Sequence, residues 1–237
     1  MEKEVKEKYD KLASFWDSVF ACDENEIEEY KKSIKGDEWK EMAPSKKLFD
    51  ACLSIANSKK VLDYGCGQGW ASLIMACSGC NDITSVDVSK NAIKMLNVYK
   101  KLFNVEKNIN AINIDDQWLK GEDSDKYDAV ICSNVIDVLP FSISKEIIKE
   151  IYRITKANST IIFSMNYYLD EEIRAKKGSD INEEGELFVD GVLRLLNKSD
   201  EEWTNIFTKY FKLIKLEHFA WLGEKEERRR LFYLKKE

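Results

Sequence analysis

Short apolar runs alternate with longer amphipathic segments through the middle of this chain. The runs are rich in Val and Ile and have the length of buried strands; they occupy residues 61–64, 83–87, 109–114, 127–133 and 160–165. The amphipathic segments repeat apolar residues at the spacing of helices that bury one face; they occupy residues 44–56, 69–78, 89–103 and 144–154. This alternation predicts a parallel sheet with helices on both faces.

The two ends of the chain follow different patterns. Up to about residue 20, apolar side chains recur at helical spacing, and residues 23–38 are polar and acidic, typical of a loop or a short exposed helix. Residues 211–221 and 229–235 are strand-like and joined by a short charged connection, which predicts an antiparallel hairpin after a helix at 200–209. Between the fifth run and that helix, residues 169–198 mix charged and apolar groups and form an insertion.

The link between the first strand and its helix carries the most specific pattern. Gly65, Gly67 and Gly69 follow an acid-ended strand, and glycine lets a chain turn sharply and bring bare backbone against a ligand. The dinucleotide fingerprint G-x-G-x-x-G has its third glycine one place further on, where this chain has Trp70. The loop therefore favours an adenosine-containing ligand without a pyrophosphate, such as S-adenosylmethionine, over a nicotinamide dinucleotide.

Acidic residues stand where ligands bind in open parallel sheets, beyond the carboxyl ends of the strands. Asp63, Asp87 and Asp115 all hold such positions. Asp87 comes 22 residues after Gly65, the separation at which an acid can accept hydrogen bonds from both ribose hydroxyls. The alternative for Asp87 is a structural acid that caps the next helix.

Composition narrows the partners. The net charge of −6 and a pI near 5.2 oppose a nucleic-acid substrate, which needs a basic footprint. The charged opening residues resemble no leader, and the longest mostly apolar stretch, 129–143, is too short to span a bilayer. We expect a cytoplasmic protein with reduced cysteines and no membrane partner. Cys77 and Cys80 form a C-x-x-C pair, but a zinc site needs further donors, so we expect no metal.

Four segments together resemble the class I S-adenosylmethionine-dependent methyltransferases, in particular small-molecule enzymes of the methyltransferase type 11 kind. They are Val61-Leu62-Asp63-Tyr64-Gly65-Cys66-Gly67-Gln68-Gly69, Ser85-Val86-Asp87-Val88-Ser89, Tyr127-Asp128-Ala129-Val130-Ile131-Cys132-Ser133-Asn134-Val135 and Tyr9-Asp10-Lys11-Leu12-Ala13-Ser14-Phe15-Trp16-Asp17. The resemblance covers essentially the whole chain. It implies one α/β domain over 1–237, a Rossmann-like sheet of seven strands that is mostly parallel with a C-terminal antiparallel hairpin. Residues 1–40 would form an N-terminal helical cover, and 169–198 a substrate-side insertion.

The resemblance also implies roles for individual residues. Asp87 would bind the ribose, Asp63 the methionine ammonium directly or through water, and the amides of residues 65–69 the methionine carboxylate. Asp115 would accept from the adenine amino group while the Asp116 amide donates to the ring, with an exchange of these two neighbours as the alternative. The full set expected to contact S-adenosylmethionine is Tyr9, Trp16, Asp63, Gly65, Cys66, Gly67, Gly69, Asp87, Val88, Asp115, Asp116, Cys132 and Ser133.

The sequence carries weaker signals for the methyl acceptor than for the donor. Asn134 and Asp137 follow the fourth strand, Tyr167 follows the fifth, and Phe188 lies in the insertion; these four are candidates for the acceptor side, with simple packing as the alternative. We expect methyl transfer to a small molecule through an O, N or S nucleophile, by in-line displacement. A general base is needed only if the acceptor is protonated, and no catalytic residue announces itself. His218, the sole histidine, has a structural role as its simpler explanation. We expect S-adenosylhomocysteine as the second product; the pattern gives no oligomeric state.

Other functions stay open at this point. A non-catalytic protein that binds S-adenosylmethionine would show the same loop. An NAD-dependent oxidoreductase is opposed by Trp70, and an RNA methyltransferase by the acidic balance; a protein methyltransferase is a further alternative. The Asn-Pro-Pro-Tyr signature of enzymes that methylate bases or glutamine on nitrogen is absent after the fourth strand, where the chain has Ser133-Asn134-Val135-Ile136, and this opposes such an activity. The arginine run Arg228-Arg229-Arg230 is interpreted as a solvated strand edge.

Overall fold

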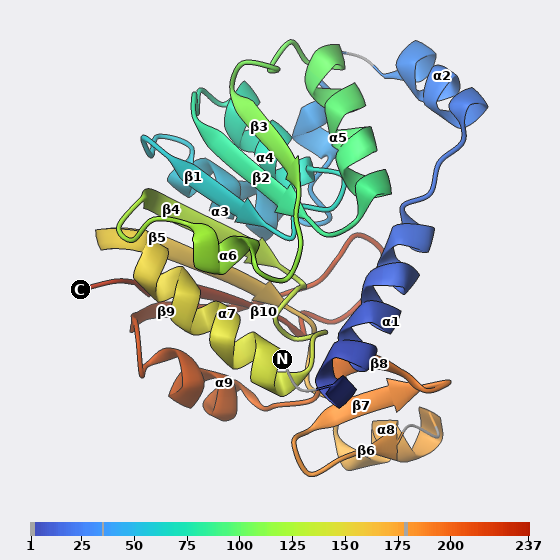
Figure 1. The fold of residues 1–237 in the computed structure, drawn as a ribbon, viewed down its shortest axis with the longest axis vertical. Coiled ribbons are helices and arrows are strands. Elements are labelled where there is room, and N and C mark those ends of the chain that lie inside the picture. Colours follow the sequence, from blue (N-terminus) through green and yellow to red (C-terminus); the bar gives the residue numbers. More distant parts are fainter. Residues whose placement is uncertain (1–2, 35, 178–179) are drawn as a thin grey trace.

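A central seven-stranded sheet organises the computed structural model, which describes residues 3–34, 36–177 and 180–237. The strand order is β3-β2-β1-β4-β5-β10-β9, with β1 to β5 parallel and β10 antiparallel to both of its neighbours. The strands are β1 (Val61–Tyr64), β2 (Ile83–Asp87), β3 (Ile109–Asn113), β4 (Tyr127–Ser133), β5 (Thr155–Met165), β9 (Lys212–Phe219) and β10 (Arg229–Lys235). The predicted sheet and its terminal hairpin are confirmed (Figure 1).

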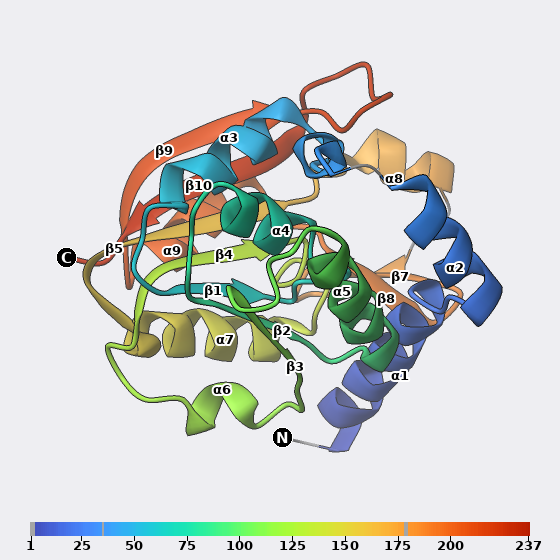
Figure 2. The same cartoon turned by 90° about the horizontal axis from the view of Figure 1, so that it is seen from above.

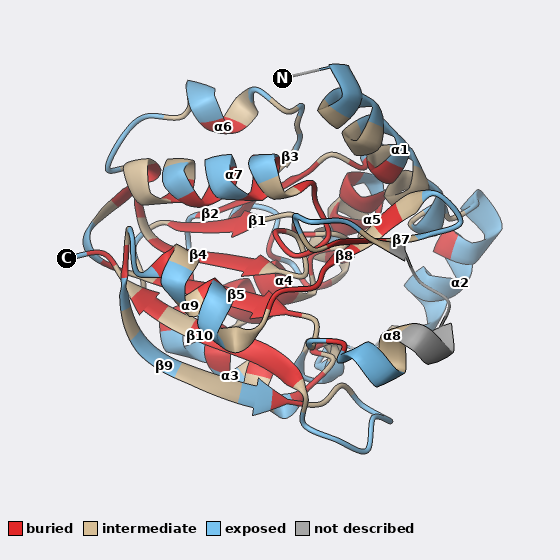
Figure 3. Ribbon diagram, turned by 90° about the horizontal axis from the view of Figure 1, so that it is seen from below, coloured by how far each residue is buried: buried red, intermediate tan, exposed pale blue. Residues whose placement is uncertain are grey.

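Helices cover both faces of this sheet, because adjacent residues of a buried strand point to opposite sides. Val61 packs with the core under α3, α4 and α5, whereas Leu62 packs with the core under α7 and α9. Figure 2 shows α3 and α4 on one side of the strands and α7 on the other, and Figure 3 shows how continuous the buried centre is. These helices are α3 (Lys46–Ile55), α4 (Trp70–Cys77), α5 (Lys90–Leu102), α7 (Phe141–Ile154) and α9 (Asp200–Phe207).

Side-chain caps fix where several helices begin. The Ser89 hydroxyl accepts a hydrogen bond from the Ala92 amide at 3.0 Å and starts α5, as its position in the sequence predicts. Ser45 caps α3, which therefore begins after Pro44. The acidic segment after residue 23 is helix α2 (Glu24–Ser33), closed by a reciprocal capping box between Asp23 and Glu26. Two short helices, η1 (Glu38–Glu41) and α6 (Trp118–Gly121), have no counterpart among the predicted elements.

The insertion folds into a second, smaller sheet, which the sequence pattern did not predict. It follows α8 (Glu171–Lys177) and has the order β6-β7-β8, with β7 antiparallel to both neighbours. The strands are β6 (Asp180–Ile181), β7 (Glu186–Val189) and β8 (Val192–Leu196). This sheet lies beside the N-terminal helix α1 (Lys3–Val19), which runs across the end of the central sheet (Figures 1 and 2).

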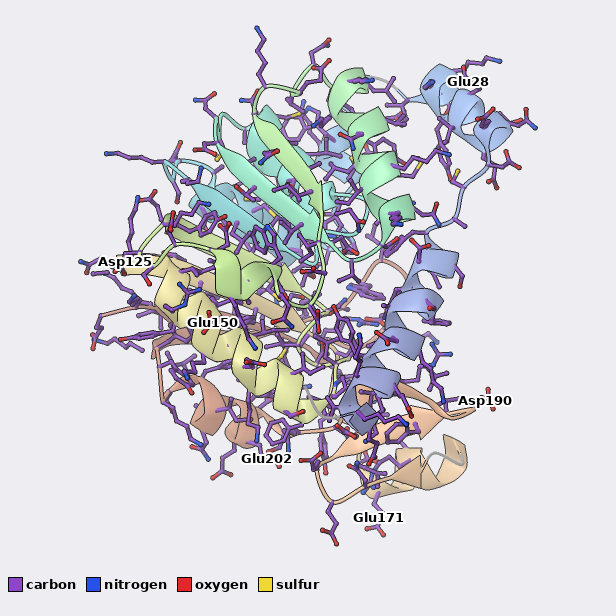
Figure 4. The ribbon with its side chains drawn as sticks, viewed as in Figure 1. Glu28, Asp125, Glu150, Glu171, Asp190 and Glu202 are labelled. Atoms are coloured by element: carbon purple, nitrogen blue, oxygen red, sulfur yellow. The ribbon has the colours of Figure 1, made fainter. Side chains whose placement is uncertain are left out.

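The outside of the molecule carries its charge in dispersed form. Figure 4 shows Glu28, Asp125, Glu171 and Asp190 extending from four separate parts of the chain. Within the described residues, every helix is too short or too polar to cross a membrane.

Candidate functional site

A cavity of about 460 Å³ lies at the carboxyl ends of β1, β2 and β4, beneath α1. Its size falls within the range of small-molecule sites. The wall combines α1, the loop after β1, the start of the β2–α5 connection, the segment after β4, and the residues Met42, Pro44 and Trp221. The position is the one that open α/β sheets use for ligands.

The three glycines after β1 adopt left-handed φ angles of +71° at Gly65, +53° at Gly67 and +87° at Gly69. A Cβ at Gly65 would come 2.2 Å from Val135 Cγ2, and one at Gly69 would come 2.3 Å from Leu96 Cδ1. These two glycines therefore permit close packing within the protein. Gly67 is different, because its bare side faces the Phe20 ring of the cavity wall, 3.3 Å from where a Cβ would stand.

The backbone amides of this loop are mostly used inside the protein. The Gly65 and Cys66 amides donate to Val86 O at 2.9 and 3.0 Å, and the Gly69 amide donates to Cys66 O at 2.9 Å. The Gly67 amide donates to Asp87 Oδ2 at 2.8 Å. Within the described structure only the Gln68 amide of this loop has no acceptor, so the expectation that the whole loop presents its amides to a ligand is wrong.

Asp87 joins the loop to the second strand at the cavity wall. Besides the bond from Gly67, its Oδ1 accepts from the Ser89 amide at 2.8 Å, and the residue is 8% exposed. Burial raises the pKa of this carboxyl, and the amide bonds oppose that shift. Each carboxylate oxygen retains a second lone pair, so Asp87 can still accept from hydroxyls in the cavity, and its neighbour Val88 lines the same wall.

Asp63 lies behind the loop and outside the cavity wall. The Ser72 hydroxyl donates to its Oδ2 at 2.6 Å, which ties the end of β1 to the first turn of α4. Burial raises the pKa of Asp63 to about 7. Asp63 therefore stabilises the turn through Ser72 and does not line the cavity.

Helix α1 lines the cavity with Tyr9 and Trp16, as the sequence predicted for the cover, and adds Leu12 and Ala13, while Phe20 follows the end of the helix. Burial raises the pKa of the Tyr9 hydroxyl, and the Asp116 carboxylate adds to the shift. Side chains of α1 that are not part of the cavity wall anchor the helix to the rest of the protein.

The C-terminal anchor of α1 is Asp17. Its Oδ1 accepts from the Ser89 hydroxyl at 2.6 Å and from the Asn91 amide at 3.1 Å. In the first half of α1, Lys8 Nζ lies 3.1 Å from Glu186 Oε2 of the small sheet. Near the C-terminal end, the Arg194 guanidinium of the same sheet lies 3.8 Å from the Phe15 ring centroid. The insertion therefore supports the cover.

The remaining expected cofactor residues divide into two groups. Cys66 and Ser133 line the cavity with Gly65, whereas Gly69 and the fully buried Cys132 lie behind it. Asp115 and Asp116 are also outside the wall; Asp115 is exposed and accepts from the Gln117 amide at 3.0 Å. Their neighbour Ile114 lines the cavity in their place.

Of the four acceptor-side candidates, only Asn134 lines the cavity. Tyr167 belongs to a separate, open depression that also contains His218, whose Nε2 lies 2.8 Å from Asp200 Oδ2. The Phe188 ring lies under Lys8, 5.6 Å from Nζ. No described residue of the insertion is part of the cavity wall.

Asp137, the fourth candidate, is fully buried in a polar network behind the wall. Its Oδ2 accepts from the backbone and side-chain nitrogens of Asn166 at 2.7 and 2.9 Å. Arg230 donates to Asn166 O at 2.7 Å, and Arg229 donates to Asn166 Oδ1 at 2.7 Å. Arg229 and Arg230 are 6% and 1% exposed, so their interpretation as a solvated strand edge is wrong.

Sequence reasoning missed much of the apolar wall. Val135, Val138 and Leu139 follow β4, and Trp221 comes from the connection between β9 and β10. The Leu222 amide donates to Pro44 O at 2.8 Å, which places Trp221 beside the chain entering α3. The resemblance of residues 127–135 pointed to the first of these segments; nothing in the local pattern around Trp221 marks it as part of a site.

Known proteins match this chain in sequence and in fold. A sequence model of the family described as "Methyltransferase domain" matches residues 38–209, more than half of the chain. No curated protein matches it. An S-adenosylmethionine-dependent methyltransferase from Mesorhizobium loti is 15% identical with a TM-score of 0.61, the match covering 82% of this chain and 98% of that one.

Two further similar structures contain S-adenosylhomocysteine. The N-methyltransferase NodS from Bradyrhizobium japonicum is 13% identical with a TM-score of 0.59, over 89% of this chain and 96% of that one. The 1,6-didemethyltoxoflavin-N1-methyltransferase from Burkholderia thailandensis also contains 1,6-didemethyltoxoflavin. It is 10% identical with a TM-score of 0.65, and the match covers 84% of this chain and 81% of that one. At these identities the likeness concerns the fold.

Proposed function

This chain belongs to the methyltransferase-domain family and is an S-adenosylmethionine-dependent methyltransferase, and we propose that it methylates a small molecule held in the cavity beneath α1. The observation that carries the proposal is the continuity of this cavity. One wall takes in Asp87 at the end of β2, Asn134 after β4 and Trp221 between β9 and β10, together with residues of α1. Donor and acceptor would share one covered space, which favours a small acceptor over a polymer.

The residues present fit S-adenosylmethionine. The bare backbone of Gly67 faces the cavity, and the Gln68 amide is free to donate to the carboxylate of the methionine part. The carboxylate of Asp87 has lone pairs for the two ribose hydroxyls. Val88 and Ile114 offer apolar surface for the adenine ring. Of the expected donors, Asp63 would act on the cofactor only through the turn that it holds.

In methyl transfer, the chain would align the donor with the acceptor and enclose both. The bound cofactor supplies a methyl group on a sulfonium, which the acceptor's lone pair takes in line while the sulfur keeps the bonding electrons. The loop after β1 and Asp87 would fix the donor, and the wall after β4 would fix the acceptor, so that the reaction proceeds within one assembly. Tyr9 and Trp16 of α1 would exclude water.

The described wall residues of this cavity include no strong general base. Among its described wall residues, Asp87 has the only charged side chain, and both of its oxygens already accept amide hydrogen bonds. Burial raises the pKa of Tyr9, Tyr64 and Cys66, so these groups stay protonated near neutral pH. We infer an acceptor whose nucleophilic atom can attack without first losing a proton to a protein base. Two of the structurally similar proteins act on nitrogen, as their names state.

Calorimetric titration tests the donor half of the proposal. We expect the protein to bind S-adenosylmethionine and S-adenosylhomocysteine and to give no signal with NAD⁺ under the same conditions. An assay of methyl release from labelled S-adenosylmethionine into a set of small heteroaromatic amines and phenols tests the other half. Binding of NAD⁺ alone, or transfer only to RNA or protein, would overturn the proposal.

A further inference from the structure

A buried carboxylate of the insertion is bonded to two segments that line the cavity. Glu186, the first residue of β7, is 1% exposed. Its Oε1 accepts from the amide of Phe141, the first residue of α7, at 3.0 Å, and Lys8 Nζ of α1 donates to its Oε2 at 3.1 Å. Phe141 comes two residues after Leu139, Lys8 directly precedes Tyr9, and both Leu139 and Tyr9 line the cavity. One side chain therefore joins the cover to the segment after β4.

The turn before β7 fixes the direction of this carboxylate. Asn182 Nδ2 donates to Glu186 Oε2 at 2.9 Å, and Asn182 Oδ1 accepts from the Glu186 amide at 2.8 Å. The Asn182 amide also donates to Glu186 O at 3.1 Å, bound in turn by HN–CO pairing across the same short loop. Because the turn already orders the side chain, pairing with Lys8 and Phe141 costs less conformational entropy.

Further contacts hold the small sheet to the same two segments. The Leu196 amide at the end of β8 donates to Asp137 O at 2.6 Å, which bonds the sheet to the chain after β4. The sheet also packs along α1, as Figure 1 shows. Glu186 and the other described residues of the insertion lie outside the cavity wall. The insertion therefore acts on the cavity through the segments that form its wall.

The charge of Lys8 matters because Glu186 is out of contact with water. A buried carboxylate is costly unless it is paired and hydrogen-bonded. Without Lys8, Glu186 would keep only neutral donors among the partners described above, and removal of one member of a buried ion pair is strongly unfavourable. The Glu186–Lys8 pair therefore favours the position of α1 against the small sheet, which is the position in which the helix covers the cavity.

We propose that Glu186 is a positioning residue that clamps α1 to the segment after β4 and thereby slows the release of the methyl donor and its product. The inference rests on the proposed function, because the cavity beneath α1 is the one assigned to the donor. Glu186 does not line this cavity and acts through Lys8 and Phe141, the neighbours of wall residues in α1 and after β4. Cover movements of this kind commonly limit product release.

Lys8→Met tests the clamp with little disturbance of the fold, because it removes the cation and keeps a long side chain that suits a helix. Stopped-flow tryptophan fluorescence can follow the release of S-adenosylhomocysteine, since Trp16, Trp70 and Trp221 line the cavity. We expect release to be about three- to tenfold faster, as for the loss of one ion pair with a buried carboxylate. Lys8→Arg keeps the cation and should restore slow release.

Lys6→Met is the matched control, because it breaks an exposed pair with Asp10 on the same helix. We expect it to release S-adenosylhomocysteine at the rate of the unmodified protein. Equal release rates for Lys8→Met and Lys6→Met would overturn the proposal. Release from Lys8→Arg as fast as from Lys8→Met would also overturn it, because the charge would then not be what holds the helix.

Hydrogen exchange in the ligand-free protein tests whether the link has two sides. We expect Lys8→Met to speed exchange in α1 alone, and Glu186→Ala to speed it both in α1 and in residues 138–144 around the start of α7. Glu184→Ala, which removes an exposed acid of the same turn, should change neither segment. Exchange around the start of α7 that is the same in folded Glu186→Ala as in Glu184→Ala would contradict the link. The Lys8 variants test the clamp even if Glu186→Ala does not fold.

These measurements separate the inference from the function on which it rests. Failure of the unmodified protein to bind S-adenosylhomocysteine would count against the proposed function, and the exchange experiment would still test the clamp. Normal binding together with an unchanged release rate in Lys8→Met would count only against the role of Glu186.

Discussion

The two halves of the cavity are built in different ways. On the donor side, the loop after β1 and Asp87 satisfy one another, with four loop amides and both carboxylate oxygens engaged. On the acceptor side, Asn134 Oδ1 and Trp221 Nε1 are buried with no partner. The proposed donor side is thus a preformed main-chain frame, whereas the proposed acceptor side includes two residues whose buried polar atoms have no partner. Variants of the loop after β1 or of Asp87 should therefore weaken donor binding. Variants of the proposed acceptor side, which includes Asn134 and Trp221, should leave donor binding unchanged.

The largest effect is expected for Gly67→Val. A β-branched residue is strained at a φ of +53°, and its side chain would enter the space between the loop and Phe20. We expect the calorimetric signal for S-adenosylmethionine to disappear, a loss of at least about 100-fold in affinity. Gly191→Val is the control, because Gly191 has a φ of +71° and a Cβ added there would meet open space, with nothing within 4 Å. Normal binding by Gly67→Val would mean that the donor lies elsewhere.

Asp87→Ala should weaken S-adenosylmethionine binding about 10- to 100-fold, because charged hydrogen bonds to the ribose are lost. Asp87→Asn keeps one acceptor oxygen and should fall between this variant and the unmodified protein. Asp82→Ala, at the other end of β2 where Asp82 pairs with Lys60 at 2.7 Å, serves as control. An unchanged affinity in folded Asp87→Ala would refute the ribose role.

Replacing Asp63 tests whether its burial makes the stability of the protein depend on pH. Its folded pKa of about 7 lies above the ordinary value of 3.8, so the unfolded chain loses this proton first as the pH rises. The stability that the protonated carboxyl contributes is complete below about pH 4 and is lost as the pH rises toward 7. Asp63→Asn should therefore gain Tm relative to the unmodified protein on going from acidic to alkaline buffer, by a few degrees for each kcal/mol. A Tm difference independent of pH would contradict this.

The smallest effect is expected at the anchor of α1. Asp17→Ala removes the acceptor of the Ser89 and Asn91 hydrogen bonds and should speed hydrogen exchange in α1. We expect only about a threefold loss of S-adenosylmethionine affinity, since the frame itself is untouched. Asp10→Ala, which breaks an exposed pair with Lys6 on the same helix, should change neither quantity. Exchange in Asp17→Ala no faster than in Asp10→Ala would exclude this role for Asp17.

The same contrast separates what the sequence predicted from what it did not. The boundaries of β1, β2, β4 and β10 and the cap at Ser89 follow from local patterns, and the structure has them at those residues. A local signal was overlooked at Asp190-Gly191, where φ values of +52° and +71° make the tight turn between β7 and β8. The Asp-Gly pair between apolar residues is a hairpin signal.

The acceptor wall could not be predicted in this way. Trp221 reaches the cavity through the hydrogen bond from Leu222 to Pro44 and the stacking of Arg229, and these contacts join segments far apart in the chain. Side-chain burial likewise reversed the interpretation of Arg229 and Arg230, because a run of charges carries no information on what packs against it. Asp137 and Tyr167 were placed at the right strand ends, but the direction of each side chain excludes it from the wall.

A crystal structure of the complex with S-adenosylhomocysteine tests the central claim most directly. We predict that both ribose hydroxyls lie within hydrogen-bond distance of the Asp87 carboxylate, with the sulfur directed toward the space between Asn134 and Trp221. Density for the nucleoside away from the ends of β1 and β2, or a sulfur directed away from Asn134, would contradict the account.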